Sequence, residues 1–291
     1  MGVRVRVVVY ADSATGSRAA SAAFARIAEL DAALSDYRAG SEINRLADRA
    51  GDAVRVGEDL YAVLELALRL ARESGGAFDP TAGSLTQLWR AARQSGTLPA
   101  PHMLESARAH IGPEKVALDS AARTVRLAEP GMRLDLGAIA KGYVLDEALR
   151  TLGRAGVRRA LVEAGGDIAV GDPPPGRQGW RIEVPGATGE LARRAAALTN
   201  AAIATSGSAE QFVVIRGVKY SHVVDPRTGL GLTNGLSATV IAENGALADA
   251  LATTATILGA EAGQAFIERF NAIGRIWSGP DRSKTINREP R

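Results

Sequence analysis

Hydrophobic and polar positions alternate at the start of the chain. Residues 3–10 carry valine at every second position with arginines between them, which is the two-residue period of a half-buried β-strand. Residues 17–34 are rich in alanine and place larger apolar side chains near helical spacing, and residues 60–71 repeat that pattern more strongly. The pattern therefore predicts a strand followed by two amphipathic helices.

In the rest of the chain, like elements come in pairs. Strands are predicted at 115–118, 124–127, 158–170 (two strands around a glycine turn), 180–184, 211–215 and 236–242. Helices are predicted at 102–110, 143–152, 246–258 and 261–270. Such pairing, rather than strict alternation, favours an α+β fold with two layers, in which helices cover antiparallel sheets. We expect two loosely similar halves with the ligand site between them.

Composition and charge exclude several classes of protein. The formal net charge is only +3 and no stretch is densely basic, so we expect no nucleic-acid partner. Cysteine is absent, which excludes disulfides, zinc thiolates and thiol catalysis. The only histidines are His102, His110 and His222, too few for a histidine-rich metal site. No apolar run approaches the roughly 20 residues of a membrane span, so we expect no transmembrane segment.

The stretch "LDLGAIAKGYVLDEA", residues 134–148, has the layout of a strand that feeds a helix through a glycine turn. Such turns often hold phosphates. Asp135 is predicted to end the strand, and Lys141 lies between the turn and the helix. The spacing fits neither of the two common phosphate-binding fingerprints. The stretch is therefore either a ligand-binding turn or a tight connection with a solvated Lys141.

Two oxygen-bearing side chains are one helical turn apart in "ALADALATTATILG", residues 246–259. Asp249 and Thr253 have i, i+4 spacing and so share one face of the predicted helix. A carboxylate and a hydroxyl are hard oxygen ligands of the kind that suits Mg²⁺. An acidic residue in a first helical turn is also favoured by the helix dipole alone, so this pair does not by itself establish a metal site.

Three further segments carry candidate chemistry. "YSHVVDPRTG" (220–229) places His222 three residues before Asp225 at a strong turn signal, as a catalytic or ligand-orienting pair or as a simple turn. "GAFDPTAG" (76–83) contains Asp79 before a proline. Tyr37 follows a predicted helix end, where its ring could stack on a flat ligand, and "ATSGS" (204–208) is predicted to be a polar turn.

Taken together and in this order, these segments closely resemble the FAD:protein FMN transferases, the ApbE-type family. The pattern D-L-G-x-x-A-K-G-Y, here "DLGAIAKGY", and the pattern H-x-x-D-P-x-T-G, here "HVVDPRTG", are quite specific to it. The resemblance runs to about residue 260. It implies one ApbE-type domain over residues 1–291 with a T-fold-like architecture.

The resemblance also implies the chemistry. Such enzymes take FAD as substrate and join its FMN half by a phosphoester bond to a Thr or Ser hydroxyl of an acceptor flavoprotein, with Mg²⁺ required and AMP released. Motif matching implies that the metal is bound by the backbone carbonyl of Ala138 and the side chains of Asp249 and Thr253. It implies FAD contacts at Met1, Tyr37, Ala77, Phe78, Asp79, Asp135, Lys141 and Val223.

Some roles stay open at this level. His222 or Asp225 is expected to be the base that takes the proton from the acceptor hydroxyl. Asp135 is expected to bond flavin or ribose donors. Lys141 either bonds the ligand or pairs with Asp135. Ala138 stands where the family commonly has glycine, which is a harmless change if only the carbonyl is used.

Two alternative functions share the same motifs. One is a flavin-binding protein that transfers nothing, and the other is a Mg²⁺-dependent FAD pyrophosphatase in which water replaces the protein hydroxyl. A serine hydrolase is excluded because the chain has no G-x-S-x-G elbow. The family is usually exported or lipid-anchored. We therefore expect a periplasmic or cell-envelope protein if the chain is a trimmed mature form, and a cytoplasmic one if it is complete.

Overall fold

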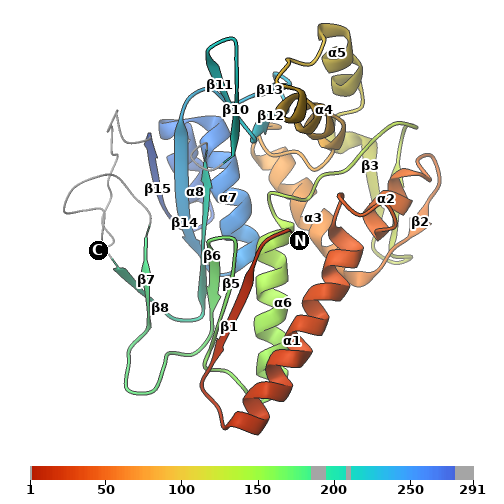
Figure 1. Cartoon of the computed structure of the whole chain (residues 1–291). Coiled ribbons are helices and arrows are strands. Elements are labelled where there is room, and N and C mark those ends of the chain that lie inside the picture. The colour runs from red at the N-terminus through yellow and green to blue at the C-terminus, as the bar shows by residue number, and fades with distance from the viewer. Residues whose placement is uncertain (1, 185–194, 208–210, 279–291) are drawn as a thin grey trace. The chain divides into compact units, whose positions relative to one another are not determined.

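The computed structural model describes residues 2–184, 195–207 and 211–278, and the chain forms two compact units (Figure 1). The first unit comprises residues 1–30, 138–206 and 236–291, and the second comprises residues 31–137 and 207–235. The chain therefore passes between the units four times. One of these passages lies within helix α1 (Ser13–Leu34).

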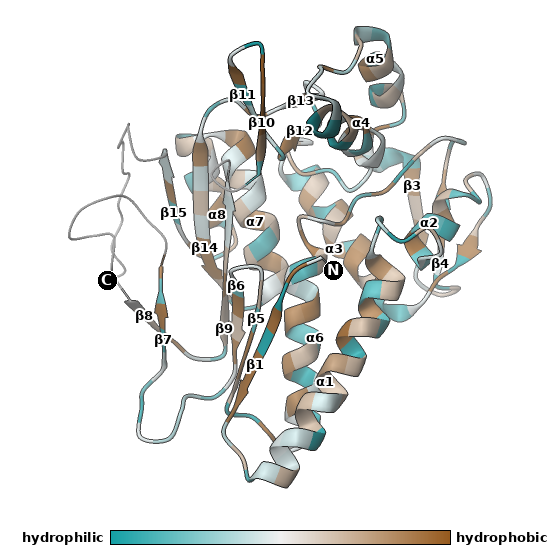
Figure 2. Ribbon diagram, viewed as in Figure 1, coloured by the Kyte–Doolittle hydropathy of each residue, from teal (hydrophilic) through white to brown (hydrophobic). Residues whose placement is uncertain are grey.

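The first unit is built on a six-stranded sheet with the strand order β1-β5-β6-β9-β14-β15. Its strands are β1 (Val5–Val9), β5 (Ala160–Ala164), β6 (Asp167–Val170), β9 (Ala201–Gly207), β14 (Leu236–Ala242) and β15 (Ile273–Ser278). The pairs β1–β5, β5–β6, β6–β9 and β14–β15 are antiparallel. In Figure 2, hydrophobic residues (brown) recur along strands of this sheet, for example β1 and β14. The sheet thus joins the start of the chain to its last third.

Helices pack on this sheet, and a hairpin packs against it as well. The helices are α6 (Ala140–Arg154), α7 (Gly245–Leu258) and α8 (Ala260–Arg269). The hairpin consists of β7 (Trp180–Glu183) and β8 (Ala195–Leu198). Its apolar side chains meet those of β5, β6 and β9 in a core of Leu161, Val170, Trp180, Ile182, Leu198 and Ile203.

The second unit combines helices with three small antiparallel sheets. Its helices are α2 (Glu42–Ala47), α3 (Glu58–Glu73), α4 (Gly83–Ser95), α5 (Pro101–Ala109) and the 3-10 helix η1 (Pro113–Lys115). One sheet has the order β2 (Val54–Arg55), β4 (Thr124–Leu127), β3 (Val116–Asp119). The others are the pair β10 (Phe212–Ile215) and β11 (Val218–Ser221), and the pair β12 (Val224–Asp225) and β13 (Leu230–Gly231).

The predicted α+β class with antiparallel sheets and covering helices is confirmed. Three local predictions were wrong. The polar segment 204–208 was predicted as a turn, but its residues 204–207 belong to β9, and Ser208 lies outside the described residues. Asp135 does not end a strand, because only Arg133 of that extended segment forms a bridge, with Ala82. Helix α6 begins at Ala140, so Lys141 lies in its first turn rather than before it.

Candidate functional site

Asp249 is the only charged residue of helix α7, whose other residues are apolar or threonine. Every residue of α7 except Thr253 and Leu258 is buried, and Asp249 itself is only 5% exposed. A buried carboxylate is costly unless it has polar partners. Its Oδ2 accepts a hydrogen bond from the backbone N–H of Gly142 at 3.2 Å, and its Oδ1 lies 3.8 Å from Lys141 Nζ. Two residues at the start of α6 therefore support it.

Asp167, the first residue of β6, is a second buried carboxylate beside the same lysine. Its Oδ1 accepts a hydrogen bond from Thr205 N–H at 3.1 Å. Its Oδ2 lies 2.5 Å from Lys141 Nζ but accepts no hydrogen bond of regular geometry. Burial and the nearby charge of Asp249 raise the pKa of Asp167 to about 7, and burial also raises the pKa of Asp249. Two buried carboxylates beside one ammonium group favour a further positive charge here.

The close approach of α6 and α7 sets this geometry. A Cβ atom on Gly142 would collide with the carbonyl group of Gly245, so the two backbones touch where only glycine fits. Asp146 of α6 accepts hydrogen bonds from Gly245 N–H at 2.6 Å and Ala246 N–H at 3.0 Å. Burial raises the pKa of Asp146 to about 6. These contacts fix the start of α7 against the first turns of α6.

Hydroxyl groups continue the polar surface one turn further along α7. The hydroxyl of Thr253 donates a hydrogen bond to Ser206 Oγ at 3.2 Å. On the neighbouring strands, the hydroxyl oxygens of Thr205 and Thr239 lie 2.8 Å apart. We call the set Lys141, Asp167, Asp249, Thr253 and Ser206 the α7 cluster. It offers carboxylate and hydroxyl oxygens, the donors that Mg²⁺ prefers.

A second arrangement lies within the second unit, around Arg90 of α4. Arg90 Nη1 is 2.5 Å from Asp36 Oδ2, and Arg90 Nη2 is 3.3 Å from Asp135 Oδ2. The guanidinium carbon also lies 3.8 Å from the ring centroid of Tyr37. Tyr37 is 74% exposed. Burial and the neighbouring charge of Asp135 raise the pKa of Asp36. We call Asp36, Tyr37, Arg90 and Asp135 the Arg90 cluster.

The segment "GAFDPTAG" is tightly folded on itself. Asp79 Oδ1 accepts hydrogen bonds from Thr81 N–H at 2.8 Å and from the Thr81 hydroxyl at 2.6 Å. The Thr81 hydroxyl oxygen in turn accepts one from Gly112 N–H at 2.8 Å. Burial raises the pKa of Asp79. Phe78 is only 4% exposed and Ala77 is fully buried. Of the two predicted aromatic FAD contacts, Tyr37 and Phe78, only Tyr37 has an exposed ring.

His222 and Asp225 differ sharply in their surroundings. Both carboxylate oxygens of Asp225 pair with the Arg227 guanidinium at 2.9 Å, and Oδ1 also accepts from Arg227 N–H. Asp225 therefore stabilises its own turn. His222 is half-buried, and its Nδ1 lies 3.1 Å from the carbonyl oxygen of Gln211. A carbonyl only accepts, so Nδ1 carries the proton in this bond and Nε2 is the basic nitrogen of the neutral ring.

The match to known proteins covers almost the whole chain. The model of the ApbE family matches residues 1–277. The chain belongs to the ApbE family. The family predicted from the motifs is therefore confirmed, and with it the expected enzyme class, a transferase.

Relatives and solved structures agree with this assignment. The "FAD:protein FMN transferase" of Treponema pallidum is 34% identical, and the match covers 96% of this chain and 82% of the relative. That of Haemophilus influenzae is 31% identical, covering 84% and 73%. The crystal structure of the ApbE protein from Thermotoga maritima has a TM-score of 0.85 at 31% identity, covering 97% and 94%. The flavin transferase ApbE from Vibrio cholerae gives 0.81 at 27%, covering 97% and 92%.

Within this ApbE-family chain, the predicted metal ligands lie in the first unit. Asp249 and Thr253 are on α7, and Ala138 lies in the turn before α6, where it is half-buried. Lys141 pairs with Asp167 and Asp249, while Asp135 pairs with Arg90. The remaining predicted FAD contacts lie in the second unit: Tyr37, Ala77, Phe78, Asp79, Asp135 and Val223. Met1 lies outside the described residues.

Sequence reasoning assigned no role to Asp167, Asp36 or Arg90. The available signal for Asp167 was a carboxylate that opens a strand of apolar residues, where a charge requires a partner. No comparable signal was available for Asp36 and Arg90, because they are 54 positions apart (90 − 36) and meet only through the fold.

Among the described residues, no group of three or more His, Cys, Asp or Glu side chains gathers to hold a metal ion. In the same part of the chain, no helix has the length and apolarity needed to cross a membrane.

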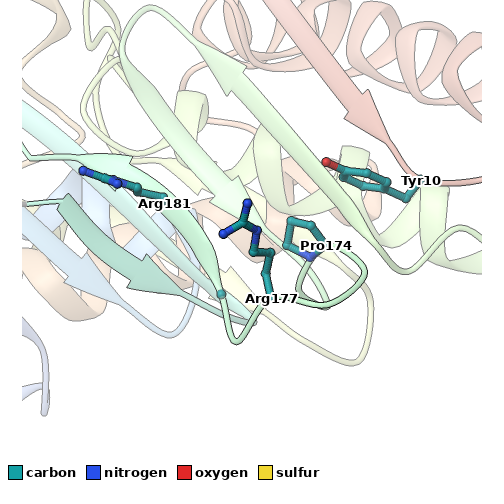
Figure 3. A pocket seen from close by; sticks show the side chains of 5 residues that line it. Tyr10, Pro174, Arg177 and Arg181 are labelled. Carbon is teal, nitrogen blue, oxygen red and sulfur yellow. The ribbon is translucent and has the colours of Figure 1, made fainter.

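A separate hollow of about 290 Å³ lies in the first unit, near the β7–β8 hairpin (Figure 3). It is lined by Tyr10, Pro174, Arg177, Gly179 and Arg181. Both arginines are exposed.

Proposed function

We propose that this chain transfers FMN from FAD to a Thr or Ser hydroxyl of an acceptor flavoprotein. The transfer depends on Mg²⁺, forms a phosphoester bond and releases AMP. The observation that carries the proposal is the α7 cluster, in which a buried carboxylate and a hydroxyl lie one turn apart on a largely apolar helix. The names of the relatives supply the substrates.

The residues of the α7 cluster fit Mg²⁺. Asp249 and Asp167 are buried carboxylates whose charges are only partly balanced by Lys141, and Asp167 Oδ2 lacks a regular hydrogen bond. Asp249, Thr253 and the Ala138 carbonyl would hold the ion. When bound, Mg²⁺ would neutralise charge on the phosphate oxygens of FAD. Asp167 acts beside this set by holding the Lys141 ammonium group.

In the proposed reaction, the acceptor hydroxyl oxygen attacks the phosphorus of the FMN half. The new P–O bond forms as the bond from that phosphorus to the AMP oxygen breaks, and AMP leaves with the electron pair. His222 Nε2 takes the hydroxyl proton, since a free hydroxyl is a poor nucleophile at neutral pH. Lys141 supplies a positive charge for the pyrophosphate, and Tyr37 and Asp135 hold the flavin half.

The test is to incubate the protein with FAD, Mg²⁺ and a candidate acceptor, and to look for a mass gain of FMN on the acceptor. Asp249→Asn keeps the side-chain shape and an acceptor for Gly142 N–H but removes the charge. We expect it to abolish both FAD cleavage and transfer, as chelation of Mg²⁺ should in the wild type.

Two other outcomes would replace the proposal. Release of FMN and AMP without a mass gain would identify a FAD pyrophosphatase. Binding of intact FAD without any cleavage would identify a flavin-binding protein. Full activity of Asp249→Asn would remove the α7 cluster from the reaction. The compartment in which the chain acts stays a prediction.

A further inference from the structure

Arg90 contacts two carboxylates and an aromatic ring at the same time. Its guanidinium group lies 2.5 Å from Asp36 and 3.3 Å from Asp135, and it lies over the Tyr37 ring at 3.8 Å. The side chains of Arg90, Asp36 and Asp135 are largely buried, at 20%, 7% and 14% exposure. One cation thus joins three segments that are distant in sequence.

The Tyr37 ring is the exposed member of this set. Asn44 Nδ2 donates hydrogen bonds to the carbonyl oxygens of Asp36 at 3.0 Å and Arg38 at 2.9 Å, which holds the backbone on both sides of Tyr37. The ring is nevertheless 74% exposed, and its observed packing partner is the Arg90 guanidinium. An ordered aromatic ring on the surface gains little from burial and loses rotamer freedom. Its arrangement is that of a platform with one face supported.

We propose that Arg90 is a positioning residue for flavin: it holds the Tyr37 ring as a preformed stacking platform and fixes the Asp135 carboxylate beside it. This inference rests on the proposed function, since it takes FAD as the ligand. Arg90 itself touches neither the transferred phosphorus nor the acceptor hydroxyl in this role.

The chemistry requires arginine rather than a generic cation. A guanidinium group is planar, so it can lie over a ring while its N–H groups face carboxylates. Here Arg90 Nη2 donates a hydrogen bond to Asp135 Oδ2, and Arg90 Nη1 forms an ion pair with Asp36 Oδ2 that lacks regular hydrogen-bond geometry. A lysine ammonium group is a point charge that can neutralise Asp36 or Asp135 but has no flat face for the ring. Arg90→Lys therefore keeps the charge and removes the platform.

The experiment compares Arg90→Lys with Arg93→Lys, a matched change on the same helix at a residue outside the cluster. FAD affinity is read from quenching of flavin fluorescence, and kcat and KM for FAD from the transfer assay. We expect Arg90→Lys to raise Kd and KM by about 3- to 30-fold, the range for partial loss of one aromatic stack. The kcat should change much less, because the lost contact stabilises bound FAD and the transition state to the same extent. Arg93→Lys should match the wild type.

A double-variant comparison separates positioning from general stability. Because Arg90 acts mainly through the ring, Arg90→Lys should weaken FAD binding much less in a Tyr37→Ala background than in the wild type. If the losses of FAD affinity in the two single variants multiply in the double variant, the proposal is overturned. It is also overturned if Tyr37→Ala weakens FAD binding while Arg90→Lys leaves the Kd unchanged. An unchanged Kd for Tyr37→Ala would overturn it as well, because the platform would have no ligand.

Failure of the proposed function looks different, since the wild type itself would then give no mass gain of FMN on the acceptor, whatever Arg90→Lys does to the Kd for FAD. If Arg90→Lys does not fold, as judged by thermal unfolding, Asp36→Asn serves the same purpose. It removes one of the two carboxylates that orient the guanidinium group and keeps Arg90. We expect an increase of about 2- to 10-fold in the Kd for FAD, and no increase would overturn the proposal.

Discussion

Gly142 and Gly245 touch backbone to backbone, and this contact sets the position of the α7 cluster. There is no room for a Cβ atom on Gly142 beside the Gly245 carbonyl group. The next contact along is the hydrogen bond from Gly142 N–H to Asp249 Oδ2. A change of one methyl group at Gly142 therefore alters both the helix packing and the support of the carboxylate.

We predict that Gly142→Ala destabilises the fold by about 1–3 kcal/mol, the usual cost of overpacking. It should also lower the kcat of FMN transfer by about 10- to 100-fold through misplacement of Asp249. Gly153→Ala is the matched control on α6, because no atom lies within 4 Å of its added Cβ. It should leave activity intact and raise stability slightly. Equal effects of the two changes on urea unfolding would contradict the packing argument.

The role of the Thr253 hydroxyl can be tested against its neighbour. Thr253→Val and Thr254→Val make the same chemical change at adjacent positions of α7. Thr254 bonds the Ala250 carbonyl within the helix, whereas Thr253 bonds Ser206 in the α7 cluster. We expect only Thr253→Val to weaken Mg²⁺ binding. The Mg²⁺ concentration needed for half-maximal transfer activity should rise by about 10- to 100-fold in this variant. A similar shift in both variants would show that Thr253 is not a ligand.

The two candidates for the general base should separate by rate and stability. His222→Asn is expected to lower the transfer rate by about 10²- to 10⁴-fold with little change in unfolding. Asp225→Asn should instead cost about 1–2 kcal/mol of stability, because it breaks a pair with a partly exposed Arg227. Activity per folded molecule should remain. A normal rate for His222→Asn would place the base elsewhere, for example on Asp79 or on the acceptor.

Stability should depend on pH through Asp146. Burial raises the pKa of this carboxyl to about 6 from 3.8, so the folded state favours the neutral form. The contribution to stability is full below pH 3.8 and is lost as pH rises through about 6. The free energy of unfolding of the wild type relative to Asp146→Asn should fall by about 2–3 kcal/mol across that window. Urea titrations of both proteins at several pH values measure it, and a constant difference would refute the assignment.

The sequence by itself determined the family, the α+β class and most of the regular elements. Alternation predicted β1, and helical spacing predicted α3 and α7. These patterns can be recognised in the sequence because residues on a buried face are apolar and recur with the period of the strand or helix. The i, i+4 spacing of Asp249 and Thr253 predicted two residues of one helix for the same reason, and both lie on α7.

Only the tertiary structure decided which distant side chains meet. Asp167 and Lys141 are paired, and Arg90 joins Asp36, Asp135 and Tyr37, through contacts between segments that no local pattern relates. The fold also decided that Phe78 is buried while Tyr37 is open, and that Asp225 is held by Arg227. Burial and partner choice are properties of the packed chain, because the cost of a buried charge depends on which groups the fold brings within hydrogen-bonding distance.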